Sequence, residues 1–208
     1  MDKDQALIIF AKAPQAGKVK TRLIPDYTGE QACRVYQQLL EFTVSALARL
    51  PDVDVELQCT PDKKHSFFQY LKAQYKIALA VQPGGDLGQK MSSALFNKLL
   101  EYKKVVLIGS DIPAIDKDYI KHAFAMLDRH PVVLGPAEDG GYVLVGLNKP
   151  QPNMFVDIAW GSSKVLQQTI DQMEPEIPIL LDTLWDVDRA EDVERFKKLR
   201  NQRYSGFS

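Results

Sequence analysis

The stretch ALIIFAKAPQAGKVKTRL, residues 6–23, joins an apolar run to a loop that is rich in cations. The run at residues 6–11 has no polar side chain, which predicts a strand covered on both faces, as in a parallel sheet. The loop after it contains no acid and four cations, Lys12, Lys18, Lys20 and Arg22. Ligands of open α/β sheets bind beyond the carboxyl ends of the strands. This position therefore predicts a site for an anion.

Strand-like and helix-like segments alternate along the rest of the chain. Apolar residues follow a helical spacing after Thr28, which forms a plausible capping box with Gln31. Residues 131–147 carry two strand-like runs without a helix between them, which predicts a hairpin or an antiparallel excursion. The alternation predicts an α/β fold with a parallel sheet and helices on both faces. The expected strands are 6–11, 53–60, 77–81, 105–108, the two runs within 131–147, and 177–181. The expected helices are 28–50, 64–74, 118–129 and 161–173, with others after the glycine-rich turn at 82–91 and the Asp-rich turn at 186–189.

Composition limits the class of protein. The chain has 208 residues, 45% hydrophobic and 25% charged, which suits one domain over residues 1–208. A net charge of −1 disfavours a nucleic-acid partner. The N-terminal residues have none of the marks of a signal peptide, and no apolar run approaches the roughly 20 residues of a membrane helix. Two reduced, buried thiols are the expected state of Cys33 and Cys59. We therefore expect a cytoplasmic protein without membrane insertion.

The cationic loop suits a di- or triphosphate. It does not match a P-loop, which needs two glycines around four residues followed by Lys-Ser/Thr. The loop still suits a phosphate, because the backbone N–H groups of the turn at Gly17 and the nearby cations attract phosphate oxygens. Arg22 can bind such oxygens bidentately, whereas Lys12 and Lys20 act as point charges. A solvated basic loop is the alternative.

A second polar loop, LIGSDIPAID at residues 107–116, follows the predicted strand 105–108. Asp111 lies at the end of this strand with no basic neighbour in sequence, which suits Mg²⁺ or Mn²⁺ held together with phosphate oxygens. The alternative is a helix cap, for which Asp116 is better placed. Under the metal hypothesis, Asp111→Ala abolishes metal-dependent nucleotide binding and leaves the thermal midpoint without ligand nearly unchanged.

The segment LWDVDRAEDVERF, residues 184–196, offers further carboxylates. Asp186 and Asp188 share a face if the backbone is extended. Asp188 is also a candidate helix cap, with Glu191 completing a capping box.

Three further features are ambiguous. Glu138 and Asp139 are candidates to bind a sugar hydroxyl or a metal, or to act as a base, and a plain turn explains them equally well. Trp160 fits either stacking on a base or sugar, or core packing. Four other residues are candidate ligand contacts from glycine-rich turns, namely Gly84, Gln89, Gly140 and Gly141.

Five stretches together resemble a known family in order and spacing: residues 11–23, 107–113, 135–147, 160–169 and 186–193. The family is a bacterial one, DUF2064-like, related to the nucleotide-diphospho-sugar transferases, and the resemblance spans residues 6–196. It implies a three-layer α/β/α sandwich of the GT-A type with a mixed, mainly parallel sheet. It also implies metal contacts for Asp111 and Asp188, and a nucleotide-phosphate loop containing Lys20 and Arg22.

The implied activity is a metal-dependent glycosyltransferase that uses a nucleotide-diphospho-sugar. Asp139 or Glu138 is then the candidate base. The alternatives are a nucleotidyltransferase that releases pyrophosphate and a non-catalytic nucleotide-sugar binding protein. The expected partners are a nucleotide or nucleotide-sugar and an unknown small-molecule acceptor, and a homodimer stays open.

Overall fold

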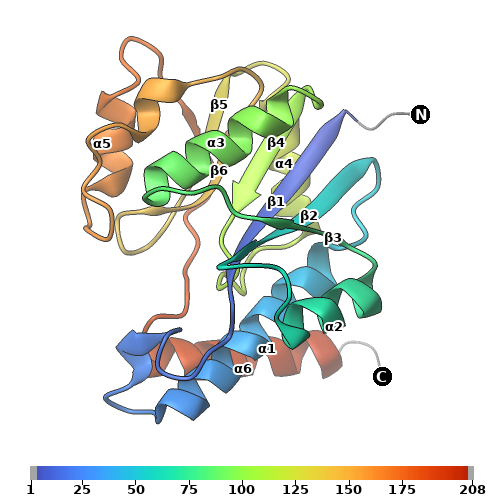
Figure 1. The fold of residues 1–208 in the computed structure, drawn as a ribbon. Helices are drawn as coiled ribbons and strands as arrows, with labels where there is room; N and C mark the ends of the chain where they lie inside the picture. The colour runs from blue at the N-terminus through green and yellow to red at the C-terminus, as the bar shows by residue number, and fades with distance from the viewer. Residues whose placement is uncertain (1–3, 206–208) are drawn as a thin grey trace.

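The computed structural model describes residues 4–205. Within them seven strands form one sheet in the order β3-β2-β1-β4-β6-β5-β7 (Figure 1). Only β6 is antiparallel to its neighbours, β4 and β5, and the other described pairs are parallel. The expected mixed, mainly parallel sheet is therefore confirmed. The strands are β1 (Gln5–Lys12), β2 (Val53–Thr60), β3 (Ala78–Val81), β4 (Lys104–Ile108), β5 (Val132–Pro136), β6 (Tyr142–Leu147) and β7 (Ile179–Leu180).

Helices cover both faces of this sheet. Alternate residues of the buried strands point to opposite faces, so that Leu7 and Ile9 pack into one apolar cluster and Ala6 and Ile8 into another. The first cluster includes residues of α1, α2 and α4, and the second includes residues of α3, η2 and α5. This is the expected three-layer sandwich. The helices are α1 (Gly29–Leu47), α2 (Ser66–Tyr75), α3 (Leu87–Leu99), α4 (Lys117–Met126), α5 (Val165–Asp171) and α6 (Ala190–Ser205), with 3₁₀ turns η1 (Thr21–Leu23) and η2 (Pro152–Phe155).

The last helix adds to this plan. In Figure 1, α6 lies along α1. Phe42 of α1 packs edge-to-face on Phe196 of α6, with ring centroids 5.4 Å apart. A third apolar cluster joins these helices to Leu23, Trp185 and Val187. It therefore holds the loop after β1 against the segment before α6.

Local sequence signals explain several boundaries. The Thr28 side chain accepts a hydrogen bond from the Gln31 backbone N–H, and the Gln31 side chain accepts one from Thr28, which confirms the expected capping box of α1. Asp116 caps α4 as expected. The helix expected over residues 161–173 is shorter, because Gly161 has a positive φ and α5 begins only at Val165.

Within residues 4–205, no helix combines the length and the apolar character needed to cross a membrane.

Candidate active site

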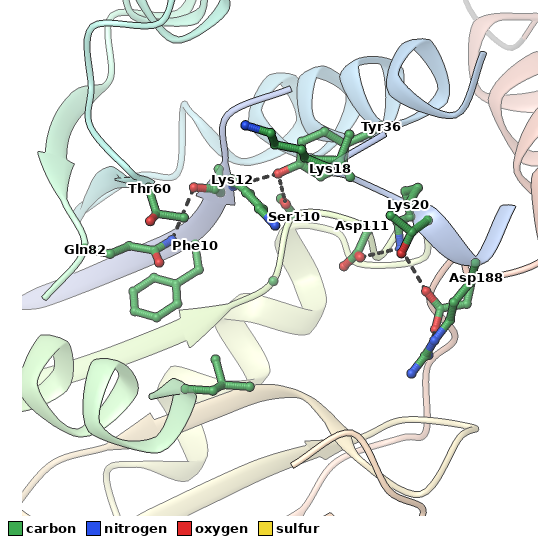
Figure 2. A pocket seen from close by; sticks show the side chains of 16 residues that line it. Phe10, Lys12, Lys18, Lys20, Tyr36, Thr60, Gln82, Ser110, Asp111 and Asp188 are labelled. Atoms are coloured by element: carbon green, nitrogen blue, oxygen red, sulfur yellow. Dashed lines mark hydrogen bonds and ion pairs between the residues drawn. The ribbon is translucent and has the colours of Figure 1, made fainter. Parts of the chain in front are cut away.

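The main cavity lies at the carboxyl ends of β1 and β4 and has a volume of about 520 Å³. The cationic loop forms one of its walls, and Gly109, Ser110 and Asp111 form another. Asp188 closes one end (Figure 2). The structure thus brings together the predicted residues Lys12, Lys20, Arg22, Asp111 and Asp188.

Lys20 occupies the point where the two predicted metal ligands meet. Its Nζ lies 2.5 Å from Asp111 Oδ2 and 3.2 Å from Asp188 Oδ1 (Figure 2). Only 6% of the Lys20 side chain is exposed, whereas Arg22 pairs with Asp188 from the solvent side. Asp111 has no basic neighbour in sequence, but the fold brings Lys20 to it from 91 positions away. Metal contact by Asp111 and Asp188 stays a prediction.

Backbone strain supports the placement of Lys20. This residue has φ 46° and ψ 44°, a left-handed conformation that costs a non-glycine residue roughly 1–2 kcal/mol. Such strain persists where surrounding contacts hold the residue in place. Here the contacts are two ion pairs and the buried neighbours Val19 and Leu23.

The charges at this point are strongly coupled. Burial lowers the pKa of Lys20, but the attraction of Asp111 and Asp188 outweighs it, so the net shift is upward. Burial likewise disfavours the charged form of Asp188, and Lys20 and Arg22 reverse this and lower its pKa. At Asp186 the attraction of Lys20 does not offset burial and the neighbouring carboxylates. Its burial, together with Asp111 and Asp188, raises its pKa to about 6.

Buried hydrogen bonds position Asp111 at the end of β4. Tyr36 of α1 accepts a hydrogen bond from the Lys12 backbone N–H at 2.9 Å, and its hydroxyl contacts the Ser110 hydroxyl at 3.2 Å. Burial raises the pKa of Tyr36 to about 12, so it is a neutral structural group. The Val187 N–H donates to the Asp111 carbonyl at 3.2 Å. These contacts tie the ends of β1 and β4 to the segment that carries Asp188.

Asp188 does not cap α6, so the alternative that the sequence left open for it was wrong. The N–H groups ahead of α6 are bound instead by Asp192, within the helix, whose carboxylate accepts hydrogen bonds from the backbone N–H groups of Asp188 and Arg189 at 3.0 and 2.8 Å. The Asp188 carboxylate is thereby left to the two cations. The backbone of Asp188 is held by the Asp192 carboxylate of α6.

The remaining cations of the loop are available for a ligand. The side chains of Lys12 and Lys18 line the main cavity and form no ion pair or hydrogen bond with any residue of the described part of the chain. Gly17 has φ 74° and abuts the start of α1, where a side chain on Gly29 would meet its backbone nitrogen. The positive φ of the turn therefore explains why this residue is a glycine. Phosphate contact by Gly17 stays a prediction.

Three residues that the sequence did not single out form the other end of the main cavity. Phe10, Thr60 and Gln82 lie there, away from Asp188 (Figure 2). They come from β1, from β2 and from the position directly after β3. Only their places at strand ends offered a signal. They show that the cavity extends from the carboxylates across three adjacent strands.

Two smaller cavities adjoin the carboxylates. The acidic cavity, about 210 Å³, shares Asp111 with the main cavity and is also lined by Asp139, Asp186, Tyr142 and Trp160. Its lining contains no Lys, Arg or His from the described residues. The outer cavity, about 390 Å³, shares Arg22 and Asp188 with the main cavity and shares Asp139 and Asp186 with the acidic one. The three cavities therefore meet around one group of carboxylates.

The expected carboxylates at 138 and 139 differ in their surroundings. Asp139 Oδ1 accepts a hydrogen bond from the Gly141 N–H at 2.9 Å, and Asp139 lines both the acidic and the outer cavity. Glu138 lines only the outer cavity of the three. It pairs with Arg195, 3.1 Å away, whose guanidinium lies over the ring of Trp185. Asp139 is therefore the better placed of the two for contact with a ligand, and its role stays a prediction.

The glycines of this turn have structural reasons of their own. Gly140 has φ 89°, and a side chain there would meet the Ser163 carbonyl oxygen at 2.3 Å. Its carbonyl accepts the Leu166 N–H, which anchors the loop before α5. Gly141 lines the acidic cavity. Ligand contact by Gly140 and Gly141 stays a prediction.

Gln89 has a cap role that competes with the expected nucleotide contact. Asp86 and Gln89 form a capping box at the start of α3, with hydrogen bonds of 2.9 and 3.1 Å. Neither Gln89 nor Gly84 lines the main, acidic or outer cavity. Their contact with a nucleotide remains only a prediction, and the turn geometry explains them without one.

The carboxylates at the junction fit a divalent cation. Asp111 and Asp188 already converge on one cation, the Lys20 ammonium, and hard carboxylate oxygens are the ligands that Mg²⁺ and Mn²⁺ prefer. No group of three or more His, Cys, Asp or Glu residues within residues 4–205 forms a complete cage. Magnesium sites at nucleotides commonly use one or two carboxylates and complete the shell with phosphates and water.

Comparisons with known proteins agree with the architecture. A protein from Desulfovibrio desulfuricans G20, provisionally named a nucleotide-diphospho-sugar transferase, shares 32% identity, with 89% of this chain and 83% of that chain covered and a TM-score of 0.81. The 4-diphosphocytidyl-2C-methyl-D-erythritol synthase of Anaerococcus prevotii DSM 20548 shares the fold at 12% identity, with 96% of each chain covered and a TM-score of 0.63.

Rv0371c of Mycobacterium tuberculosis H37Rv, solved in complex with manganese, has a TM-score of 0.54 at 14% identity, with 93% of this chain and 97% of that chain covered. No curated protein matches. Residues 43–162 match the family model described as "Uncharacterized protein conserved in bacteria (DUF2064)". The chain therefore belongs to the DUF2064 family and has the fold of the nucleotide-diphospho-sugar transferases.

Proposed function

We propose that this protein is a metal-dependent glycosyltransferase that takes a nucleotide-diphospho-sugar as donor. The observation that carries this proposal is the contrast between adjoining cavities. The main cavity is lined by Lys12, Lys18, Lys20 and Arg22, whereas the described lining of the acidic cavity contains carboxylates and no cation. The first suits the diphosphate of a donor. The second suits a hydroxylated sugar, whose O–H groups donate to carboxylates.

The same contrast disfavours nucleotidyl transfer to a phosphorylated acceptor. Such an acceptor would bring its own negative charge into a cavity lined by Asp111, Asp139 and Asp186. Negative charges that share one small cavity repel each other, and no Lys, Arg or His of the described lining offsets this repulsion. A neutral acceptor meets no such penalty. The aromatic rings of Tyr142 and Trp160, packed edge-to-face at 6.3 Å, add an apolar wall for a sugar ring.

The residues have distinct roles in the proposed reaction. An acceptor hydroxyl attacks the anomeric carbon of the donor sugar and passes its proton to the Asp139 carboxylate. The bond from that carbon to the β-phosphate oxygen breaks, and the leaving nucleoside diphosphate keeps the electron pair. Lys12, Lys18 and Arg22 stabilise its charge. Asp111 and Asp188 would hold the divalent ion, which when bound neutralises phosphate charge.

Product analysis tests this proposal. The protein is incubated with Mn²⁺ and either nucleotide-sugars plus neutral sugars or nucleoside triphosphates plus sugar phosphates. Release of nucleoside diphosphate is expected only in the first mixture. Pyrophosphate release alone would support nucleotidyl transfer instead, and binding without turnover in both would support a non-catalytic binding protein.

Two variants separate the role of Asp139 from that of its neighbour. Asp139→Asn should reduce transfer by about 10²-fold to 10⁴-fold, the usual contribution of a general base, without loss of donor binding. Glu138→Gln is the matched control, because Glu138 pairs with Arg195. It should retain most of the activity. If Glu138→Gln is the inactive variant, the base has been assigned to the wrong carboxylate.

A further inference from the structure

The end of the main cavity opposite the carboxylates has its own polar group. Phe10, Thr60 and Gln82 come from neighbouring strand ends, and Figure 2 shows the Gln82 side chain beside the Phe10 ring. Because Lys20, Arg22 and the carboxylates lie at the other end, a nucleotide with its phosphates there extends its base toward Gln82. This end is therefore the place where a base can be read.

The orientation of the Gln82 amide is determined by its partners. Its Nε2 donates to the Ala11 carbonyl at 3.2 Å and to the Gln58 carbonyl at 3.0 Å. The backbone N–H of Gln82 donates to the Cys59 carbonyl at 2.9 Å. An amide nitrogen has two N–H groups, and both face main-chain carbonyls that can only accept. A flipped amide would place oxygen against oxygen, so this orientation is the satisfied one.

The consequence is that Gln82 offers the cavity an acceptor and no donor. Its carbonyl oxygen forms no hydrogen bond with another described residue. The hydroxyl of Thr60 can donate or accept and so does not discriminate. Phe10 offers a ring against which a base can pack. The hydrogen-bond preference at this end therefore comes from the Gln82 carbonyl.

We propose that this end of the main cavity binds the nucleobase and that Gln82 selects a base with an amino group at position 4 of a pyrimidine or position 6 of a purine. This inference rests on the proposed function, since it takes the ligand to be a nucleotide. Cytosine and adenine present an N–H₂ donor where uracil and hypoxanthine present a carbonyl oxygen. An oxygen facing the Gln82 carbonyl leaves two acceptors unpaired. A site built around one polar group rejects the analogue that lacks its partner.

Paired nucleotides that differ only at this group test the proposal. Binding of CDP, UDP, ADP and IDP with Mn²⁺ is measured by isothermal titration calorimetry on the wild-type protein. The amino-bearing member of a pair should bind at least about fivefold more tightly, which is the typical net effect of one hydrogen bond. If UDP equals or exceeds CDP and IDP equals or exceeds ADP, the selection by Gln82 is refuted and the proposed function stands. If no nucleotide binds, both fall.

A variant assigns the preference to Gln82. Gln82→Leu should bring each pair to within about twofold, because the acceptor is gone and the shape is roughly retained. The control is Gln74→Leu, an exposed position in α2 that lines none of the three cavities. It should keep the wild-type ratio. A Gln82→Leu protein that binds nucleotides and still prefers the amino-bearing member of each pair would overturn the assignment to Gln82. If this variant does not fold, the affinity ratios of the wild-type protein still decide which class of base is preferred.

Discussion

Replacement of Lys20 by Met tests whether its ammonium holds the place of a divalent ion. The variant removes the charge that lies 2.5 Å from Asp111 and 3.2 Å from Asp188 and keeps an unbranched chain of similar length. Removal of one partner from a buried ion pair costs about 3–5 kcal/mol. Asp111 and Asp188 are 30% and 25% exposed, and Arg22 still pairs with Asp188, so we expect a smaller loss of about 2 kcal/mol. For a chain of this size that lowers the thermal midpoint by about 4–8 °C.

The decisive measurement is Mn²⁺ binding without nucleotide, followed by calorimetry and thermal unfolding. The Lys20→Met variant should bind Mn²⁺ at least about tenfold more tightly than the wild type, a difference of about 1.4 kcal/mol, and recover stability as it does so. Lys18→Met makes the same charge change at an exposed position in the same loop and should alter neither quantity. Equal Mn²⁺ affinities in wild type and Lys20→Met would refute the reasoning, as would an unchanged thermal midpoint in the metal-free variant.

Three other outcomes follow from the same geometry. The pKa of Asp186 rises from 3.8 to about 6, so between these pH values the folded state holds a proton that the unfolded state releases. The free energy of unfolding of the metal-free protein should therefore fall by about 1–2 kcal/mol between about pH 4 and pH 6. Urea unfolding of Asp186→Asn should show a smaller change of this free energy with pH. Arg22→Ala should weaken nucleoside diphosphates about tenfold and nucleosides little in calorimetric titrations, and equal losses would contradict a phosphate contact. Asp111→Ala, expected from sequence alone to leave the ligand-free thermal midpoint nearly unchanged, should lower it by about 3–6 °C in scanning fluorimetry, because buried Lys20 then keeps only Asp188.

Local patterns predicted most of the elements but not the position of β6. The apolar runs and the Thr28 cap identify β1 and α1 closely because their causes lie within a few residues. The hairpin of residues 131–147 was expected, yet its second strand inserts between β4 and β5. That placement depends on pairing with residues 105–108, some 40 positions earlier. Hydrophobic pattern alone does not specify a partner strand at such a separation.

The site shows the same division between local and distant causes. Strand-end positions were enough to select Asp111 and the cationic loop, because ligands of α/β sheets bind there. The role of Lys20 depends on contacts across 91 and 168 positions, which no spacing rule reaches. Gln82 is one polar residue after a short strand, and the role we propose for it depends on the two carbonyls that occupy its N–H groups in the fold.

If a divalent ion replaces Lys20 as proposed, the third apolar cluster would keep this charged site folded during the exchange. Leu23 follows the cationic loop, Trp185 and Val187 flank Asp186, and all three are at least nine-tenths buried against α1 and α6. Full burial of a large apolar side chain contributes roughly 1.5–3 kcal/mol, so these three outweigh the loss of about 2 kcal/mol expected for the Lys20 ion pairs. The two chain segments would therefore stay in register if the ammonium left. A site held together mainly by its ion pairs would instead open whenever a divalent ion replaced Lys20.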